Sequence, residues 1–377
     1  MNKTDYKRLG DYIREVDSRN RDLAVTRLLG VNISKEFMPS IANTIGTDMS
    51  SYKIVTREQF AYGPVTSRNG DKVSIALLSD DVPAIISQAY TVFEVVDKTK
   101  LLPEYLMMWF RRPEFDRYAR YQSHGSAREV FGWEEMCDVR LPIPPLSRQR
   151  EIVAEYETLT RRIRLNERLI SSLESAAQTL YRRTFLDNPN PSWRTGTLGE
   201  IVEINPRLSI KKGEDAFFVE MEALPTKAFF IQEVQRREFS GGSKFQNGDV
   251  LFARITPCME NGKVAVVSEI PQNEVAFGST EFIVLRGRSF SVSAFLATLV
   301  RNEDFRSYAK SHMKGTDGRQ RVDSSALEVY KILIPPTEEL NAIESKLSSL
   351  VGLSLTHMRE NKTLTKIQNL LLARIGE

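Results

Sequence analysis

Residues 147–186 carry a hydrophobic repeat that strongly limits how this chain can fold. Starting at Ile152 and stepping alternately by four and three residues, every position is apolar except Asn166. The positions are Ile152, Tyr156, Leu159, Ile163, Asn166, Ile170, Leu173, Ala177 and Leu180. This spacing predicts the seam of a coiled coil rather than a generic amphipathic helix. A helix from Gln149 to Phe185 would be roughly 55 Å long, so we expect a second helix to cover its seam.

Residues 337–375 provide the expected partner helix. The same steps from Leu340 give a seam with apolar ends and a polar middle that contains His357. Nearly the same phrase introduces both helices, Leu141-Pro-Ile-Pro-Pro-Leu146 and Ile332-Leu-Ile-Pro-Pro-Thr337. Proline fixes φ and disfavours helix at the preceding residue, so each pair predicts an extended lead-in. Because both seams keep the same phase after these phrases, a helix pair explains the pattern better than two unrelated surface helices.

The segments that precede the two helices repeat one plan, which indicates an internal duplication. Arg8-Leu-Gly-Asp-Tyr-Ile13 matches Thr197-Leu-Gly-Glu-Ile-Val202, with an offset of about 190 residues. Phe115-Asp-Arg-Tyr-Ala119 matches Phe305-Arg-Ser-Tyr-Ala309 with a similar offset. In both segments, short alternating runs and Asn-Gly turns predict strands and hairpins, followed by a helix. The proline-broken stretch at 187–193 indicates a linker between the halves.

We therefore predict an α/β (α+β) fold with two similar mixed α/β domains, at residues 1–146 and 188–336. An antiparallel coiled coil of the long helices at 147–187 and 337–377 would separate them. Each half is a globular domain followed by a helix, so this pairing would relate the halves by a pseudo-twofold axis. Asn166 and His357 hold equivalent seam positions near the helix midpoints. We predict that they face each other in a polar layer that fixes the register.

Charge and cysteine content restrict the class of protein. The formal net charge is +3, and residues 147–186, with 8 basic and 5 acidic side chains, account for all of it. A nucleic-acid binder that acts alone usually has a clear basic excess, so any DNA-binding surface here must be local or shared with partners. Two cysteines, three scattered histidines, a polar start and no long apolar run predict a cytoplasmic protein. We expect no disulfide framework, no metal site and no membrane span.

Common catalytic motifs are missing from the sequence. It contains no Walker loop, no G-x-G-x-x-G, no G-x-S-x-G and no H-E-x-x-H. Adenine methyltransferases carry Asn or Asp before their Pro-Pro pair, whereas the pairs here follow Ile143 and Ile334. These absences favour a binding protein, and an enzyme that acts alone is disfavoured.

Several phrases in both halves resemble the specificity subunits of type I restriction–modification systems. They are Pro142-Ile-Pro-Pro-Leu146 with Gln149, Leu251-Phe-Ala-Arg-Ile-Thr-Pro-Cys-Met-Glu-Asn-Gly-Lys263, Gly278-Ser-Thr-Glu-Phe282 and Thr66-Ser-Arg-Asn-Gly-Asp71. The resemblance implies two target-recognition domains that each read one half of a split sequence in double-stranded DNA. The helices would set the spacing and dock two methyltransferase (modification) subunits, and restriction/translocase subunits would join later. It implies no cofactor in this chain, with S-adenosylmethionine, ATP and Mg on partner subunits.

We predict DNA contacts from side chains of the types that read base edges or hold phosphates. In the first domain they are Thr66, Ser67, Arg68, Asn69, Lys72, Ser126 and Arg128. In the second domain they are Arg254, Thr256, Asn261, Lys263, Ser279, Thr280, Lys314, Arg319 and Arg321. The alternative for the Asn-Gly pairs is that they only form hairpin turns. At the level of the whole chain, the alternative is a coiled-coil adaptor whose domains bind proteins and not DNA.

Overall fold

The computed structural model describes residues 6–40, 46–66, 72–123, 129–288, 292–316 and 319–376. The chain divides into two compact units. Unit 1 contains residues 1–162 and 363–377, and unit 2 contains residues 163–362. Each unit therefore combines one globular segment with part of both long helices.

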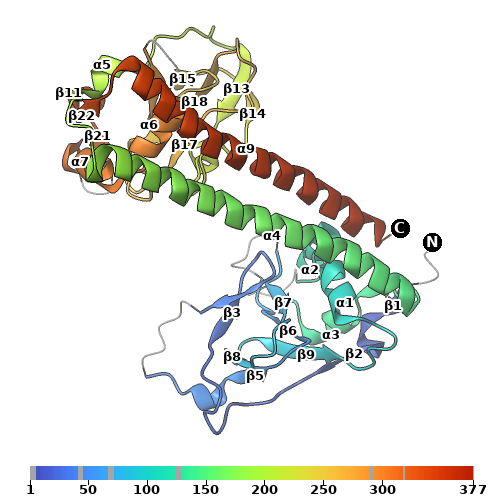
Figure 1. The fold of residues 1–377 in the computed structure, drawn as a ribbon. Helices are drawn as coiled ribbons and strands as arrows, with labels where there is room; N and C mark the ends of the chain where they lie inside the picture. The colour runs from blue at the N-terminus through green and yellow to red at the C-terminus, as the bar shows by residue number, and fades with distance from the viewer. Residues whose placement is uncertain are drawn as a thin grey trace. The chain divides into compact units, whose positions relative to one another are not determined.

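Unit 1 is built on a sheet with the strand order β2-β9-β6-β7, in which every neighbouring pair is antiparallel (Figure 1). Its strands are β1 (Tyr6–Arg8), β2 (Ile13–Glu15), β3 (Leu29–Val31), β4 (Phe37–Pro39), β5 (Lys53–Val55), β6 (Gln59–Tyr62), β7 (Ile75–Leu77), β8 (Ala84–Ile86), β9 (Thr91–Val95) and β10 (Arg140–Pro142). Its short helices are α1 (Pro103–Phe110), α2 (Pro113–Ser123) and α3 (Trp133–Cys137). The long helix α4 (Leu146–Arg182) begins in this unit.

Aromatic side chains from the sheet and from α1 form the core of unit 1. Phe60 of β6 stacks on Phe93 of β9 with ring centroids 4.8 Å apart, and Phe110 of α1 meets both rings edge-on. Leu372 and Ile375, from the end of the second long helix, join the same buried cluster. The end of the chain is therefore part of the core of the first domain.

Unit 2 repeats the main sheet of unit 1, with the order β12-β19-β16-β17 and the same antiparallel directions. Its strands are β11 (Arg194–Thr197), β12 (Val202–Ile204), β13 (Asp215–Val219), β14 (Gln235–Glu238), β15 (Ser243–Phe245), β16 (Val250–Ala253), β17 (Val264–Val266), β18 (Ala276–Gly278), β19 (Phe282–Gly287), β20 (Met313–Lys314), β21 (Arg321–Val322) and β22 (Lys331–Ile334). Its helices are α5 (Leu198–Ile201), α6 (Ser293–Leu299), α7 (Glu303–Ser311) and α8 (Ser324–Glu328), and α9 (Thr337–Arg374) begins here. The shared strand order and the constant sequence offset agree with the predicted duplication. Unit 2 adds a sheet of its own, β14-β13-β18-β15.

Both long helices form as the seam repeat predicts, and within each unit their segments run in opposite directions. In unit 1 the amide of Gln368 donates to the hydroxyl of Thr160 at 2.7 Å, and Val153 shares a core cluster with Leu372 and Ile375. In unit 2 the amide of Asn166 donates to the side-chain oxygen of Asn361 at 2.8 Å. Within the described ranges, none of the helices combines the length and apolar character that a membrane span needs.

The predicted pairing of Asn166 with His357 is wrong, although a polar layer is present. The partner of Asn166 is Asn361, one helical turn further along α9, and the Asn361 amide also reaches the Ile163 carbonyl at 3.4 Å. His357 Nδ1 lies 3.6 Å from Glu360 on its own helix. A heptad repeat defines which side of a helix is buried but leaves its axial position free by whole turns, so the sequence could not separate these two partners.

Candidate nucleic-acid interface

Three segments of unit 2 that lie far apart in the sequence meet at one end of its main sheet. The segment after β16 pairs with the segment leading into β21, because Val322 N–H donates to the Arg254 carbonyl at 2.8 Å and Thr256 N–H donates to the Gln320 carbonyl at 3.1 Å. The turn before β19 joins them through the Arg254 N–H, which donates to the Glu281 carbonyl at 2.9 Å. This arrangement follows from the antiparallel pairing of β16 and β19, which brings the end of one strand to the start of the other.

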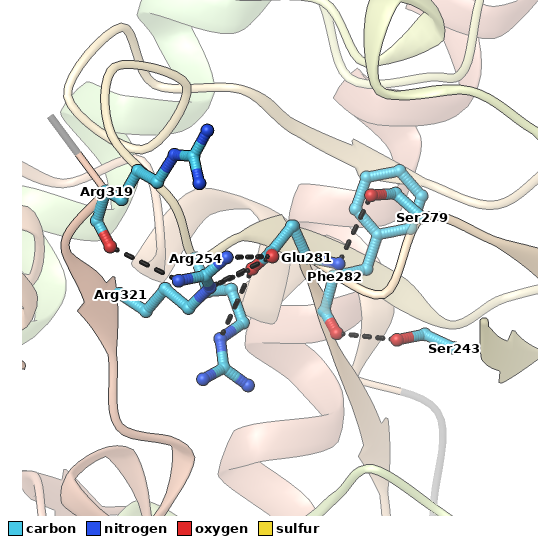
Figure 2. A network of polar contacts seen from close by, with 7 residues as sticks. All are labelled: Ser243, Arg254, Ser279, Glu281, Phe282, Arg319 and Arg321. Carbon is cyan, nitrogen blue, oxygen red and sulfur yellow. Dashed lines mark hydrogen bonds and ion pairs between the residues drawn. The ribbon is translucent and has the colours of Figure 1, made fainter. Parts of the chain in front are cut away.

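A carboxylate between two arginines organises this site (Figure 2). Arg321 donates from Nε and Nη2 to Glu281 at 2.7–2.9 Å, which is the bidentate geometry that a guanidinium prefers. The Nε of Arg254 lies 3.8 Å from the other side of the same carboxylate. The hydrogen bonds that Arg321 donates to Glu281 hold the pKa of Arg321 above its ordinary value. Arg321 is therefore a fixed cation at the surface.

The rest of the positive charge at the site remains available to a ligand. The terminal nitrogens of Arg254 point away from Glu281 in Figure 2 and make no hydrogen bond to any residue that the structure describes. The exposed side chain of Arg319 also points away from Glu281, while its carbonyl accepts from Arg321 at 3.3 Å. Three guanidinium groups against one carboxylate leave this surface locally positive, although unit 2 as a whole is close to neutral. We call Arg254, Glu281, Arg319 and Arg321 the arginine cluster.

The other residues predicted in the second domain have varied environments. The Ser279 hydroxyl accepts from the Glu281 N–H at 3.2 Å, so it supports the turn that carries the carboxylate. Thr280 and Asn261 are exposed, and Thr256 is half-buried with its hydroxyl unpartnered among the described residues. Their DNA contacts stay predictions.

Two lysines predicted to contact DNA already have partners inside unit 2. The ammonium of Lys263 donates to the Met221 carbonyl at 2.9 Å, and it therefore links two loops of the domain. The ammonium of Lys314 donates to Asp323 at 2.7 Å, and this contact holds the pKa of Asp323 well below its usual range. Each lysine would have to leave its partner before it could bind a phosphate.

Unit 1 has the same loop arrangement, with different side chains. Phe131 N–H donates to the Pro64 carbonyl at 2.8 Å, and Thr66 N–H donates to the Glu129 carbonyl at 3.0 Å, which repeats the pattern around Arg254. Thr66 is 5% exposed and its hydroxyl donates to Glu129, so its side chain holds the loop together, whereas Lys72 is exposed. Five predicted residues lie outside the described ranges: Ser67, Arg68, Asn69, Ser126 and Arg128.

The two domains therefore present unlike chemistry at matching positions. Where unit 2 places Arg254 and Arg321, the corresponding hydrogen-bonded positions of unit 1 hold Pro64 and Val130. Val130 is 39% exposed. Residue type did not indicate Glu281 as part of the interface, because an acidic side chain is not expected to bind DNA. The available signal was its position inside the phrase Gly278-Ser-Thr-Glu-Phe282, between two predicted DNA-contacting residues and a buried strand.

Among the described residues, no three or more His, Cys, Asp or Glu side chains are placed to hold a metal ion. The side chains described at this interface offer hydrogen bonding and charge, supplied mainly by guanidinium groups.

Comparison with known proteins identifies relatives of one kind. A family model described as the type I restriction modification DNA specificity domain matches residues 35–175. The specificity subunits of the type I restriction enzymes EcoAI and EcoEI of Escherichia coli are 31% and 30% identical over 181 residues. These matches cover 46% of this chain but only 30% of each relative, so this chain matches less than a third of either protein.

A solved structure extends the likeness to the fold. The S subunit of a type I restriction–modification system from M. genitalium aligns over 99% of this chain and 96% of its own, with a TM-score of 0.60 and 14% sequence identity. At this identity the match supports the fold alone, and it covers both domains and the long helices. The family model, the two E. coli relatives and this solved structure all come from type I restriction–modification specificity subunits, and these are the proteins that the chain resembles.

Proposed function

We propose that this chain is the DNA sequence-specificity subunit of a type I restriction–modification complex. The observation that carries the proposal is the repeated loop arrangement that presents a guanidinium cluster in unit 2 and apolar side chains in unit 1. Two domains of one fold with unlike surfaces suit a DNA target whose two halves differ in sequence. The names of the E. coli relatives agree with this role.

In this proposal each globular domain reads one half of a bipartite DNA target. The long helices form the antiparallel coiled coil expected from their seams, set the distance between the half-sites and dock two methyltransferase subunits. The chain itself is non-catalytic. S-adenosylmethionine, ATP and Mg act on the methyltransferase and restriction subunits, which are its protein partners.

The arginine cluster supplies the chemistry of readout in the second domain. An arginine can donate two parallel hydrogen bonds to O6 and N7 of guanine, which is the commonest specific contact in the major groove. Arg254 has unpartnered terminal nitrogens for such a contact, and Arg321 is held rigidly by Glu281. The rigid guanidinium of Arg321 suits a contact to a phosphate, and the free guanidinium of Arg254 beside it suits a contact to a base.

The proposal can be tested by mapping DNA methylation. The chain is co-expressed with its methyltransferase subunit, and modified sites are mapped genome-wide. We expect methylation at a split sequence with a fixed gap. Arg254→Ala should relax the base preference at one position of one half-site only. Arg236→Ala is the control, because Arg236 is also ion-paired, to Asp215, but lies on β14 outside the cluster.

Methylation without a split consensus would contradict the proposal. It would favour the coiled-coil adaptor, in which the globular domains bind proteins, and under that hypothesis the assembled complex would also protect no split site in a footprinting experiment. The named relatives do not favour this alternative.

A further inference from the structure

Val139 of unit 1 and Tyr330 of unit 2 occupy the same place in the duplicated fold. Leu9 N–H donates to the Val139 carbonyl at 2.8 Å, and Leu198 N–H donates to the Tyr330 carbonyl at 2.9 Å. The next residue begins β10 in unit 1 and β22 in unit 2. The backbone at these two positions is therefore equivalent, and the side chains differ by an aromatic ring.

In unit 2 this ring fills a space beside α7. The ring centroid of Tyr330 lies 5.0 Å from that of Phe305 and 4.8 Å from that of Tyr308, both in edge-on geometry. The counterparts of these residues in unit 1 are Phe115 and Tyr118 of α2, from the repeated Phe-x-x-Tyr-Ala phrase. Edge-on aromatic neighbours are a favourable environment for an inserted ring.

In unit 1 the counterparts of all three residues, Phe115, Tyr118 and Val139, line a cavity, and valine has no ring to place in it. Its volume is about 550 Å³, within the range of ligand-binding pockets. Phe115, Tyr118, Trp109 and Val139 line it together with charged residues and Tyr6. The charged lining residues are Arg112, Glu114, Asp138 and Arg140.

The guanidinium of Arg112 lies beside this cavity and is packed between the Trp109 ring and the backbone at Gly376. Arg112 is only 8% exposed, and its guanidinium lies over the Trp109 ring at 4.4 Å. Its Nε is 3.6 Å from Glu114 but makes no hydrogen bond to any described residue. The Nε is covered by protein atoms, so Arg112 contributes positive charge beside the cavity rather than a donor directed into it.

We propose that this cavity binds a tyrosine side chain presented by a partner protein. The aromatic ring would take the place that Tyr330 takes in unit 2, and the hydroxyl would lie among the charged lining residues. An aromatic pocket surrounded by charged groups has the composition of a protein-interface anchor site. On the proposed function, from which this part of the inference follows, the partner is the methyltransferase subunit.

The chemistry of the cavity is tested with p-cresol, the side-chain analogue of tyrosine, by calorimetric titration of the full chain. We expect one binding site in the natural chain. Val139→Tyr should fill the cavity from within and weaken p-cresol binding at least tenfold. Val82→Tyr is the matched control, because Val82 is in the same unit, is 57% exposed and does not line the cavity. Tyr330→Val should open a second site in unit 2.

The partner is tested by co-purification of the same variants with the methyltransferase subunit. Val139→Tyr should lower the yield of complex at least fivefold, whereas Val82→Tyr should not. Absence of p-cresol binding, or equal binding by the Val139→Tyr chain, would overturn the cavity assignment. Normal assembly of the Val139→Tyr chain would overturn the partner assignment. Because the titration uses no DNA, failure of sequence-specific methylation would count against the proposed function and leave the cavity result intact.

Discussion

The side-chain oxygen of Gln149 accepts a hydrogen bond from the backbone N–H of Leu102 at 2.9 Å. The Gln149 amide nitrogen donates to the carbonyls of Lys100 at 2.7 Å and Pro144 at 2.9 Å. Gln149 is fully buried. One side chain thus connects the first turn of α4 to the segment that leads into α1, and it explains why a glutamine follows the double proline.

In unit 2 a different residue connects the long helix to the neighbouring short helix. Leu340 holds the position in α9 that corresponds to Gln149, and it cannot form these hydrogen bonds. Glu344, one turn later, accepts from the backbone N–H groups of Ala294 and Phe295 at 3.0 and 2.8 Å. The start of α6 is thereby joined to α9 by a carboxylate, which also suits the positive end of the helix dipole.

Replacing Gln149 should destabilise unit 1 strongly. Gln149→Ala removes three hydrogen bonds and leaves buried backbone groups unpaired, so we expect a loss of about 2–4 kcal/mol in the free energy of unfolding. Urea-induced unfolding measures it. Arg150→Ala, at the exposed neighbouring position, should change stability by less than about 0.5 kcal/mol. Equal effects of the two substitutions would rule out the structural role assigned to Gln149.

Glu344 should make the stability of unit 2 depend on pH. Burial raises the pKa of this carboxyl above its ordinary value, despite the hydrogen bonds from Phe295 and Ala294. Because the folded pKa exceeds the unfolded one, the group's contribution is full below the unfolded pKa of about 4.3 and is lost as the pH rises through the folded pKa. The unfolding free energy of the natural chain, relative to Glu344→Gln, should therefore fall as the pH rises above about 4. If the urea midpoints of the natural chain and of Glu344→Gln change in parallel with pH, the expectation is refuted.

The asparagine pair between the long helices should show strong coupling. Asn166→Leu leaves Asn361 without its partner in a buried layer, so we expect a loss of about 1–3 kcal/mol in unfolding free energy. The double variant Asn166→Leu, Asn361→Leu should recover most of this loss, because an apolar seam pair needs no hydrogen bond. A double-mutant cycle by urea unfolding gives the coupling. If the losses in unfolding free energy of the two single variants simply add in the double variant, the two residues do not act as a pair.

Glu281 should control specificity more than affinity. Glu281→Gln removes a negative charge from the arginine cluster and frees the Arg321 guanidinium. Binding of the assembled complex to unrelated DNA should therefore tighten, while the ratio of cognate to unrelated affinity falls about tenfold, the loss expected for one base contact. Titrations with both DNAs over a series of salt concentrations measure this ratio. The control Glu222→Gln alters an exposed carboxylate of the same unit. An unchanged ratio for Glu281→Gln would remove the cluster from sequence readout.

The sequence predicted those features of the fold that depend on the spacing of residues along the chain. Repeated phrases with a constant offset predicted two similar domains, and the seams predicted both long helices, because periodicity records which side of an element is buried. The partner of Asn166 was not predictable. Its axial position depends on how each domain holds the helix ends, through contacts such as Tyr6 with Gly376, and these are separated by almost the whole chain.

For the candidate interface, residue type was a weaker guide than position. Arg254, Ser279 and Arg321 meet because antiparallel strands bring their loops together, and the phrases that contain them were visible in the sequence. Nothing in the composition distinguished the exposed Arg319 from Lys263, whose ammonium is bound to a carbonyl inside the domain. The importance of Glu281 emerges only when both arginines are seen beside it.

The division of the chain into units has a consequence for synthesis on the ribosome. Leu372 and Ile375, which complete the core of unit 1, are translated after the whole of unit 2. Part of the apolar surface of the first globular segment therefore stays uncovered until the ribosome has passed the whole of unit 2. Nascent chains halted before residue 363 should accordingly depend on chaperones, although their first globular segment has already been translated completely.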